Sequence, residues 1–141
     1  MGTDIHTHIE VKLEGRDEWL HYAAPAVQRN YTLFGLMSDI GRDLDVRPIV
    51  PPRGLPADLS EVTRACWEAD RRAPPGHGMS WLGVEDLRVL RGRLEGTMGS
   101  AFDWLKHDLE HGIFRTYLLG SALTDVRAPF ADLRIVFWFD C

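Results

Sequence analysis

The sequence has few cysteines and no long apolar run. Only two cysteines occur among the 141 residues, Cys66 and Cys141, and they form no Cys-x-x-Cys pair. A disulfide framework or a cysteine-rich zinc site is therefore not expected, and a reducing cytoplasm fits this cysteine usage best. No apolar stretch approaches the roughly 18 residues that cross a bilayer, and the first residues lack the basic and apolar segments of a secretory signal. We therefore expect no association with a membrane.

A basic surface is also missing. The chain has 16 Lys and Arg residues against 21 Asp and Glu residues, which gives a formal net charge of −5. Proteins that bind the phosphate backbone of nucleic acids usually carry a basic stripe, so generic nucleic-acid binding is not expected. Glycine-rich phosphate loops, dinucleotide-binding fingerprints, nucleophile elbows and EF-hands are absent as well. Small ligands and protein partners are the classes of partner left, and the sequence does not determine the oligomeric state.

The residues that are present predict one globular domain with strands at both ends. Apolar residues make up 45% of the chain and charged residues 26%, as in ordinary globular domains of this length. Strict alternation over residues 5–13 predicts a half-buried strand, and residues 14–17 and 19–22 predict the turn and returning strand of a hairpin. Residues 133–139 are apolar in both phases, which predicts a strand buried on both faces at the centre of the sheet.

Apolar residues at helical spacing predict about four helices between these strands. Asn30 is a suitable N-cap for a helix over residues 31–44, and Ser60 for one over residues 61–71. The prolines of residues 45–59 predict an extended connection, and the Pro/Gly-rich residues 73–78 predict a loop. The third and fourth helices are expected to follow Gly83 and Ser100. The inward residues expected for the second and third helices are Val62, Ala65, Cys66 and Ala69, and Val84, Leu87, Leu90 and Leu94.

The predicted fold is therefore a single α+β domain covering residues 1–141. It contains an N-terminal β-hairpin and a buried C-terminal strand in one mainly antiparallel sheet, packed by about four helices.

The first strand carries the main candidate site. Asp4, His6, His8 and Glu10 alternate, so they lie on one face about 6.6–6.8 Å apart. Two imidazoles at that spacing can lean onto one metal ion, while a carboxylate adds a ligand, orients an imidazole or acts as a general base. Without a metal, the same face can hold an acid/base pair. The alternative is an ordinary polar face of a strand that contacts solvent.

Further candidates lie elsewhere in the chain. His77 is flanked by glycines in a predicted loop, where it is either accessible to a ligand or an ordinary turn residue. Arg29, Arg47 and Arg53 are on predicted loops, where a guanidinium binds a phosphate or carboxylate ligand or closes an ion pair within the protein. Asp140 directly follows the buried strand, which is either a functional position or the place where the chain returns to solvent.

Five segments in order resemble a group of small uncharacterised proteins of bacteriophages and prophages, especially those of actinobacteria. The segments are MGTDIHTHIE at 1–10, RNYTLF at 29–34, PRGLPADLS at 52–60, HGMSWL at 77–82 and VFWFD at 136–140. Members of the group typically begin Met-Gly-Cys-Asp-Ile-His, with a Glu four residues beyond the His. The positions of this chain that match are Asp4, His6, Glu10, Arg29, Asn30, Tyr31, Arg53, Gly54, Asp58, His77, Ser80, Trp81 and Asp140.

The resemblance implies a phage protein located in the cytoplasm of the host cell, but it implies no activity. Thr3 stands where the group usually has Cys, which weighs against a role for that thiol. His8 is less typical of the group than His6, which weighs against a metal site that needs both imidazoles. We therefore expect His8 to be an ordinary residue facing solvent.

The function expected from these residues is metal-assisted hydrolysis of a phosphoester or nucleotide-like substrate. Asp4, His6 and His77 are the expected ligands of a divalent metal ion. The expected catalytic residues are Glu10, His77 and Asp140, and the expected substrate-binding residues are Arg29, Tyr31, Arg53 and Trp81.

Two alternatives are a non-enzymatic phage protein and a purely structural module. The first sequesters a signalling nucleotide, or inhibits a host defence protein, as a small acidic phage protein can. The second predicts that Asp4, His6 and His77 lie scattered on the surface. A site requires instead that His77 and Asp140 come within about 6 Å of the face formed by Asp4 and His6, because reacting groups must converge on one point.

Overall fold

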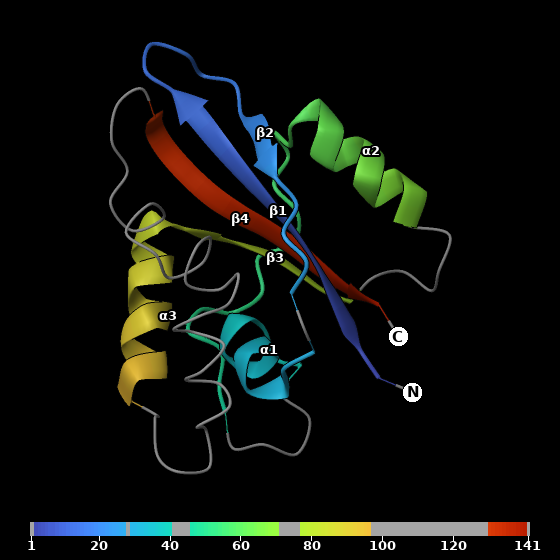
Figure 1. Cartoon of the computed structure of the whole chain (residues 1–141), viewed down its shortest axis with the longest axis vertical. Coiled ribbons are helices and arrows are strands. Elements are labelled where there is room, and N and C mark those ends of the chain that lie inside the picture. The colour runs from blue at the N-terminus through green and yellow to red at the C-terminus, as the bar shows by residue number, and fades with distance from the viewer. Residues whose placement is uncertain (1, 28, 41–45, 71–76, 97–129, 141) are drawn as a thin grey trace.

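One antiparallel sheet organises the chain. The computed structural model describes residues 2–27, 29–40, 46–70, 77–96 and 130–140, with the side chains of residues 77, 91 and 94–96 outside this description. Within these ranges four strands follow the order β2-β1-β4-β3 (Figure 1). Their bounds are Asp4–Leu13 for β1, Leu20–Ala23 for β2, His77–Gly83 for β3 and Phe130–Asp140 for β4. The helices described are α1 (Tyr31–Met37), α2 (Glu61–Asp70) and α3 (Val84–Gly96). The predicted α+β class is confirmed.

The predicted hairpin and the central C-terminal strand are confirmed as well. Gly15 has a φ of 77° in the turn between β1 and β2, a conformation that glycine adopts without strain. β4 pairs with β1 from Asp4↔Asp140 to Leu13↔Phe130 and with β3 on its other side. The first and last strands of the chain therefore lie side by side at the centre of the sheet (Figure 1).

One face of the sheet carries the apolar core. The phase of β1 that contains Ile5 and Ile9 packs with the phase of β4 that contains Phe137 and Phe139. α1 and α3 lie on this side of the sheet, and α2 lies on the other (Figure 1). Each fully buried Leu or Phe side chain contributes about 1.5–3 kcal/mol. The helix residues buried in this core are Leu33, Phe34, Leu36 and Met37 of α1 and Leu87 and Leu90 of α3, which confirms the stripe predicted for the third helix at Leu87 and Leu90.

The opposite face is polar, yet α2 covers much of it. His8 is 6% exposed and Glu10 is 0% exposed. The expectation that His8 faces solvent is therefore wrong. Alternation correctly predicted which face of β1 it occupies, but a helix from a distant part of the chain packs against that face.

The inward stripe of α2 shares Cys66 with the predicted one and otherwise differs from it. Thr63 is fully buried and Trp67 is half-buried, whereas Val62 is 51% exposed, and Ala65 and Ala69 are also exposed. The inward stripe follows the spacing i, i+3, i+4, i+7 through Thr63, Cys66, Trp67 and Asp70. Because this stripe includes two polar residues that bind the polar face of the sheet, apolar spacing alone identified only Cys66 among its members.

α1 begins where the sequence predicted and ends earlier. Asn30 is its N-cap, accepting a hydrogen bond from Leu33 N at 3.1 Å. The helix ends at Met37 instead of continuing to residue 44, because Ser38 is extended and its hydroxyl donates to the carbonyl of Gly78 in β3. The end of the helix therefore coincides with a tertiary contact to β3, and residues 41–45 lie outside the described part of the chain.

The sequence predicted a loop over residues 73–78 and no strand over residues 79–83. Residues 77–83 instead form an edge strand paired with β4, because non-local backbone pairing outweighs the glycine-rich local composition. The extended connection is confirmed for residues 46–59, which contain no helix or strand. The fourth helix predicted from Ser100 lies outside the described residues.

Replacing Gly78 with alanine is expected to lower the free energy of unfolding by about 1–3 kcal/mol. Gly78 has a φ of 66°, and a Cβ there would lie 2.5 Å from Ile40 Cδ1 and 3.0 Å from Phe139 Cδ2. Gly15→Ala is the matched control, because Gly15 has a similar φ of 77° with nothing within 4 Å of a Cβ. Urea denaturation of both variants separates the steric clash from the backbone strain. Equal losses of stability in the two variants would contradict the packing described around Gly78.

Candidate functional site

His6 lies between two carboxylates that come from different elements. Its Nε2 atom is 2.6 Å from Asp140 Oδ2 at the end of β4. Its Nδ1 atom is 3.6 Å from Asp70 Oδ2, on the last residue of α2. Asp140 therefore meets the condition, set from the sequence, of lying within about 6 Å of the polar face of β1. Asp70 was not among the residues selected from the sequence.

Trp138 of β4 organises the surroundings of His6. Its indole Nε1 donates a hydrogen bond to Asp70 Oδ2 at 3.1 Å. Its ring stacks with His6 at 6.0 Å and with His8 at 4.8 Å, measured between centroids, and Trp67 of α2 meets it edge-on at 5.3 Å. Trp138 therefore holds Asp70 in place while supporting the imidazole that Asp70 approaches.

His8 forms a second imidazole contact beneath α2. Its Nδ1 atom lies 3.1 Å from Nε2 of His21 on β2. Burial, followed by the charge of nearby His21, lowers the pKa of His8 from 6.5 to about 4. His8 is therefore neutral at physiological pH and packs as an aromatic ring.

A cavity of about 450 Å³ opens beside His6. It is lined by residues 5–8 of β1, by residues 24–27 after β2, and by Cys66, Ala69 and Asp70 of α2. The side chains of His6 and Asp70 are 33% and 39% exposed, so both are accessible to a ligand. This volume falls within the range of about 300–1,000 Å³ typical of small-molecule sites.

Glu10, expected to be catalytic, is bound within the protein. Its Oε2 atom accepts from the backbone N–H of Ser60 at 2.8 Å, and its Oε1 atom accepts from Arg134 Nε at 2.8 Å. Burial by itself raises the pKa of the Glu10 carboxyl. Hydrogen bonds, those from Ser60 first, outweigh that effect and hold the pKa below its usual value. Both carboxylate oxygens are therefore already hydrogen-bonded, and Glu10 is inaccessible to a substrate.

The network around Glu10 attaches the start of α2 to the sheet. Arg134 also pairs with Asp58 at 2.9 Å and stacks over the ring of Trp19 at 4.1 Å. Ser60 caps α2 through its hydroxyl, which accepts from Thr63 N at 3.3 Å. We call Glu10, Arg134, Asp58 and Ser60 the Glu10 anchor. Because it fixes one end of α2, it also helps to place Asp70 at the other end.

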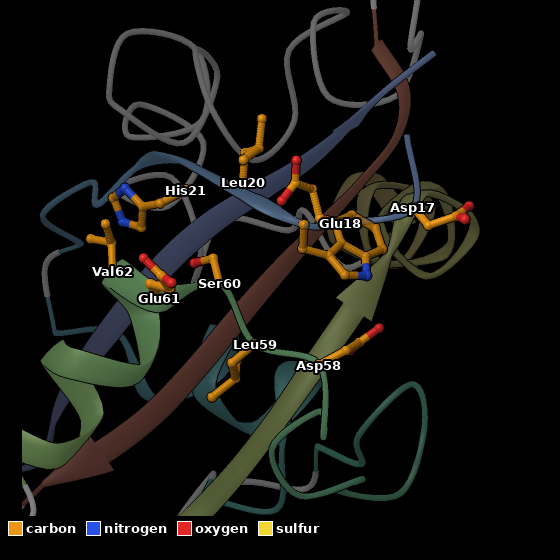
Figure 2. Close-up of a pocket in the computed structure, with 10 residues that line it drawn as sticks. Asp17, Glu18, Leu20, His21, Asp58, Leu59, Ser60, Glu61 and Val62 are labelled. Carbon is orange, nitrogen blue, oxygen red and sulfur yellow. The ribbon is translucent and has the colours of Figure 1, made fainter. Parts of the chain in front are cut away.

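A second cavity of about 440 Å³ lies between residues 17–21 and residues 58–62 (Figure 2), and Asp58 and Ser60 of the anchor line it. Figure 2 shows Glu18 and His21 on one side of it and Asp58, Ser60 and Glu61 on the other. Four carboxylate residues line this cavity, and they disfavour an anionic substrate there. They are Asp17, Glu18, Asp58 and Glu61.

Three other predicted residues meet near the start of β1, namely Asp4 in that strand, Arg29, and Tyr31 at the start of α1. Asp4 Oδ1 accepts from Arg29 Nη2 at 2.9 Å, and Asp4 pairs through the backbone with Asp140. The hydroxyl of Tyr31 accepts from the backbone N–H of Thr3 at 3.0 Å. The structure thus brings Asp4 and Arg29 close to the carboxylate that contacts His6.

Arg53 and Trp81 form a separate pair near β3 and α3. The Arg53 guanidinium stacks on Trp81 at 4.3 Å and binds Asp86 with distances of 2.6 Å and 3.1 Å. Burial by itself raises the pKa of Asp86, but hydrogen bonds from Arg53 and from the backbone of Gly83 outweigh it and lower the pKa. The described contacts of Arg53 are those of an intramolecular ion pair, the alternative left open by the sequence.

His77 begins the edge strand. Its backbone lies opposite Phe139, which lies opposite Ile5 of β1 in turn. The position of its side chain lies outside what the structure describes, so its predicted role as a metal ligand and catalytic residue stays a prediction.

The described residues offer a pair of metal-ligand atoms beside the cavity. No group of three or more His, Cys, Asp or Glu residues within the described ranges is arranged to hold a metal ion. The 3.6 Å between His6 Nδ1 and Asp70 Oδ2 is nevertheless shorter than the sum of one metal–nitrogen and one metal–oxygen bond, about 4.1 Å. His6 and Asp70 are therefore the described residues that would hold a divalent ion at this cavity.

No helix in the described part of the chain is long and apolar enough to cross a membrane. No protein-family model, no curated protein and no solved structure matches this chain.

Proposed function

We propose that this chain is a metal-assisted hydrolase of a small phosphoester or nucleotide-like substrate, with His6 at its centre. The observation that supports this most is the line from Asp140 to His6 to Asp70, with distances of 2.6 Å and 3.6 Å, at the wall of a cavity. An imidazole held by a carboxylate at one nitrogen, with its other nitrogen facing an accessible carboxylate, is a common arrangement of metal and acid/base sites.

In this proposal His6 Nδ1 and Asp70 Oδ2 hold a divalent cation. Asp140 fixes the ring orientation and tautomer of His6 through Nε2, and Trp138 holds Asp70 through its N–H group. A divalent ion bound there would supply Lewis-acid chemistry toward the phosphoryl group. Asp140 and Trp138 are positioning residues, because neither needs to touch the substrate.

The charges around His6 favour the binding of a cation over the binding of an anion. Asp4, Asp70 and Asp140 are near His6, and the only guanidinium described beside them, that of Arg29, is shared with Asp4. These carboxylates repel a phosphoester unless a divalent ion neutralises them. Arg29 is the one predicted substrate-binding arginine that adjoins this group, and we assign it to the anionic group of the substrate.

Replacing His6 with alanine or Asp70 with asparagine is expected to abolish high-affinity metal binding and to reduce turnover by at least about 100-fold. Asp140→Asn is expected to weaken metal binding by about 10–100-fold, since it removes only an orienting carboxylate. Metal-stripped protein is titrated with Mn²⁺ or Zn²⁺ by calorimetry, and turnover is measured on a panel of phosphomonoesters and phosphodiesters.

Glu68→Gln is the matched control, because Glu68 is an exposed carboxylate on the same helix as Asp70. It should bind metal and turn over substrate as the parent protein does. Unchanged turnover in His6→Ala would overturn the proposal. Nucleotide binding without product in the metal-loaded parent would favour the non-enzymatic alternative, a phage protein that sequesters a signalling nucleotide.

A further inference from the structure

The cavity beside His6 runs along the edge of β1. Residues 5, 6, 7 and 8 all line it, although successive side chains of a strand point to opposite faces. Four consecutive residues can line one cavity only where it follows the edge of their strand. β2 pairs with β1 only from Ile9 onward, so no described strand pairs with this edge between Asp4 and His8.

The walls on either side of this edge are mostly apolar. One wall is the segment Ala24, Pro25, Ala26 and Val27, and the other is formed by Cys66 and Ala69 of α2. The hydroxyl of Thr7 donates to the carbonyl of Pro25 at 2.7 Å, which holds the first wall against β1. The cavity therefore has two apolar sides, and between them lies strand backbone that pairs with no strand in the described part of the chain.

This combination matches a flat heteroaromatic ring. The faces of such a ring are apolar and bury well between aliphatic walls. Its edge carries donors and acceptors that can pair with the N–H and C=O groups of an unpaired strand. His6 and Asp70, at the same cavity, are within reach of a group attached to that ring.

We infer that this cavity binds the nucleobase of the substrate, which makes the substrate class a nucleoside phosphoester. The inference rests on the proposed function for the position of the phosphoryl group, at His6 and Asp70. It does not require turnover to be observed, because a nucleoside without phosphate still fills the cavity.

Cys66 reports on occupancy, because its half-buried thiol lines the cavity. Adenosine is expected to slow alkylation of Cys66 by N-ethylmaleimide, and at four times its dissociation constant the slowing is about fivefold, since only the free cavity reacts. Peptide mass spectrometry separates Cys66 from the second cysteine, Cys141. Glycerol phosphate, which has no base, should give no protection.

Ala69→Leu places a larger side chain in the cavity wall and should abolish protection by adenosine. Ala65→Leu is the control, since Ala65 is exposed one turn earlier on α2 and does not line the cavity. Protection is expressed as the ratio of rates with and without adenosine in each variant, so that any change in thiol access cancels.

The two proposals fail in different ways. Absence of protection by adenosine, or equal protection in Ala69→Leu and the parent protein, would overturn the nucleobase site. Protection by adenosine that Ala69→Leu removes, without hydrolysis of any phosphoester, would support the nucleobase site and overturn the hydrolase.

Discussion

Replacing Glu10 with alanine is expected to lower the free energy of unfolding by about 3–5 kcal/mol. The substitution leaves the Arg134 guanidinium, whose side chain is 5% exposed, without its buried partner at 2.7 Å. It also removes the acceptor of the Ser60 N–H group. Asp58 compensates only weakly, because its side chain is 64% exposed and its attraction to Arg134 is screened by water. Chemical denaturation followed by tryptophan fluorescence measures the loss.

A paired substitution separates the buried charge from the lost contact. Glu10→Leu together with Arg134→Leu should recover much of the stability, because no unpaired charge is then buried. The control is Glu18→Ala, which breaks the exposed ion pair with Arg16 and should cost less than about 1 kcal/mol. A Glu10→Ala variant no less stable than Glu18→Ala would show that the Glu10 anchor does not hold α2.

Lowering the pH from 7 to about 4 is expected to remove about 3 kcal/mol of stability through His8 alone. The ordinary pKa of 6.5 applies to the unfolded chain, whereas burial and nearby His21 lower the pKa to about 4 in the folded protein. The unfolded chain therefore takes up a proton first as the pH falls. The stabilisation is fully present above pH 6.5 and is lost as the pH approaches 4, at about 1.4 kcal/mol per pH unit.

The test compares the parent protein with His8→Phe in the presence of a chelator. Phenylalanine keeps an aromatic ring against Trp138 but cannot be protonated, so the stability of the variant should depend less on pH between 6.5 and 4. The other titratable groups that act on His8, namely His6, Asp70 and Glu10, are present in both proteins. Identical pH profiles of the free energy of unfolding would contradict the burial of a neutral His8.

Local sequence patterns were sufficient to predict two kinds of element. One kind has its partners close in the chain, and the other is completely buried. Alternation in β1, the hairpin turn at Gly15 and the doubly apolar β4 each express a period or a composition that a strand requires. The N-caps Asn30 and Ser60 satisfy backbone N–H groups within three residues, so they too could be identified locally.

The roles of two residues could be assigned only from the tertiary structure. Glu10 looked equivalent to His6 in the sequence, and only the approach of Ser60 and Arg134 makes it part of a buried anchor. Asp70 was not selected from the sequence, because only the docking of α2 on the sheet brings it to Trp138 and His6.

The sequence by itself therefore determined the α+β class, the central position of the last strand, and the face of β1 that carries the polar groups. The tertiary structure decided which of those groups are buried and which are accessible. The physical reason is that periodicity specifies the direction in which a side chain points, whereas its accessibility depends on what else packs there. The accessibility of His6, Asp70 and Asp140 depends on contacts between residues more than 60 positions apart in the chain.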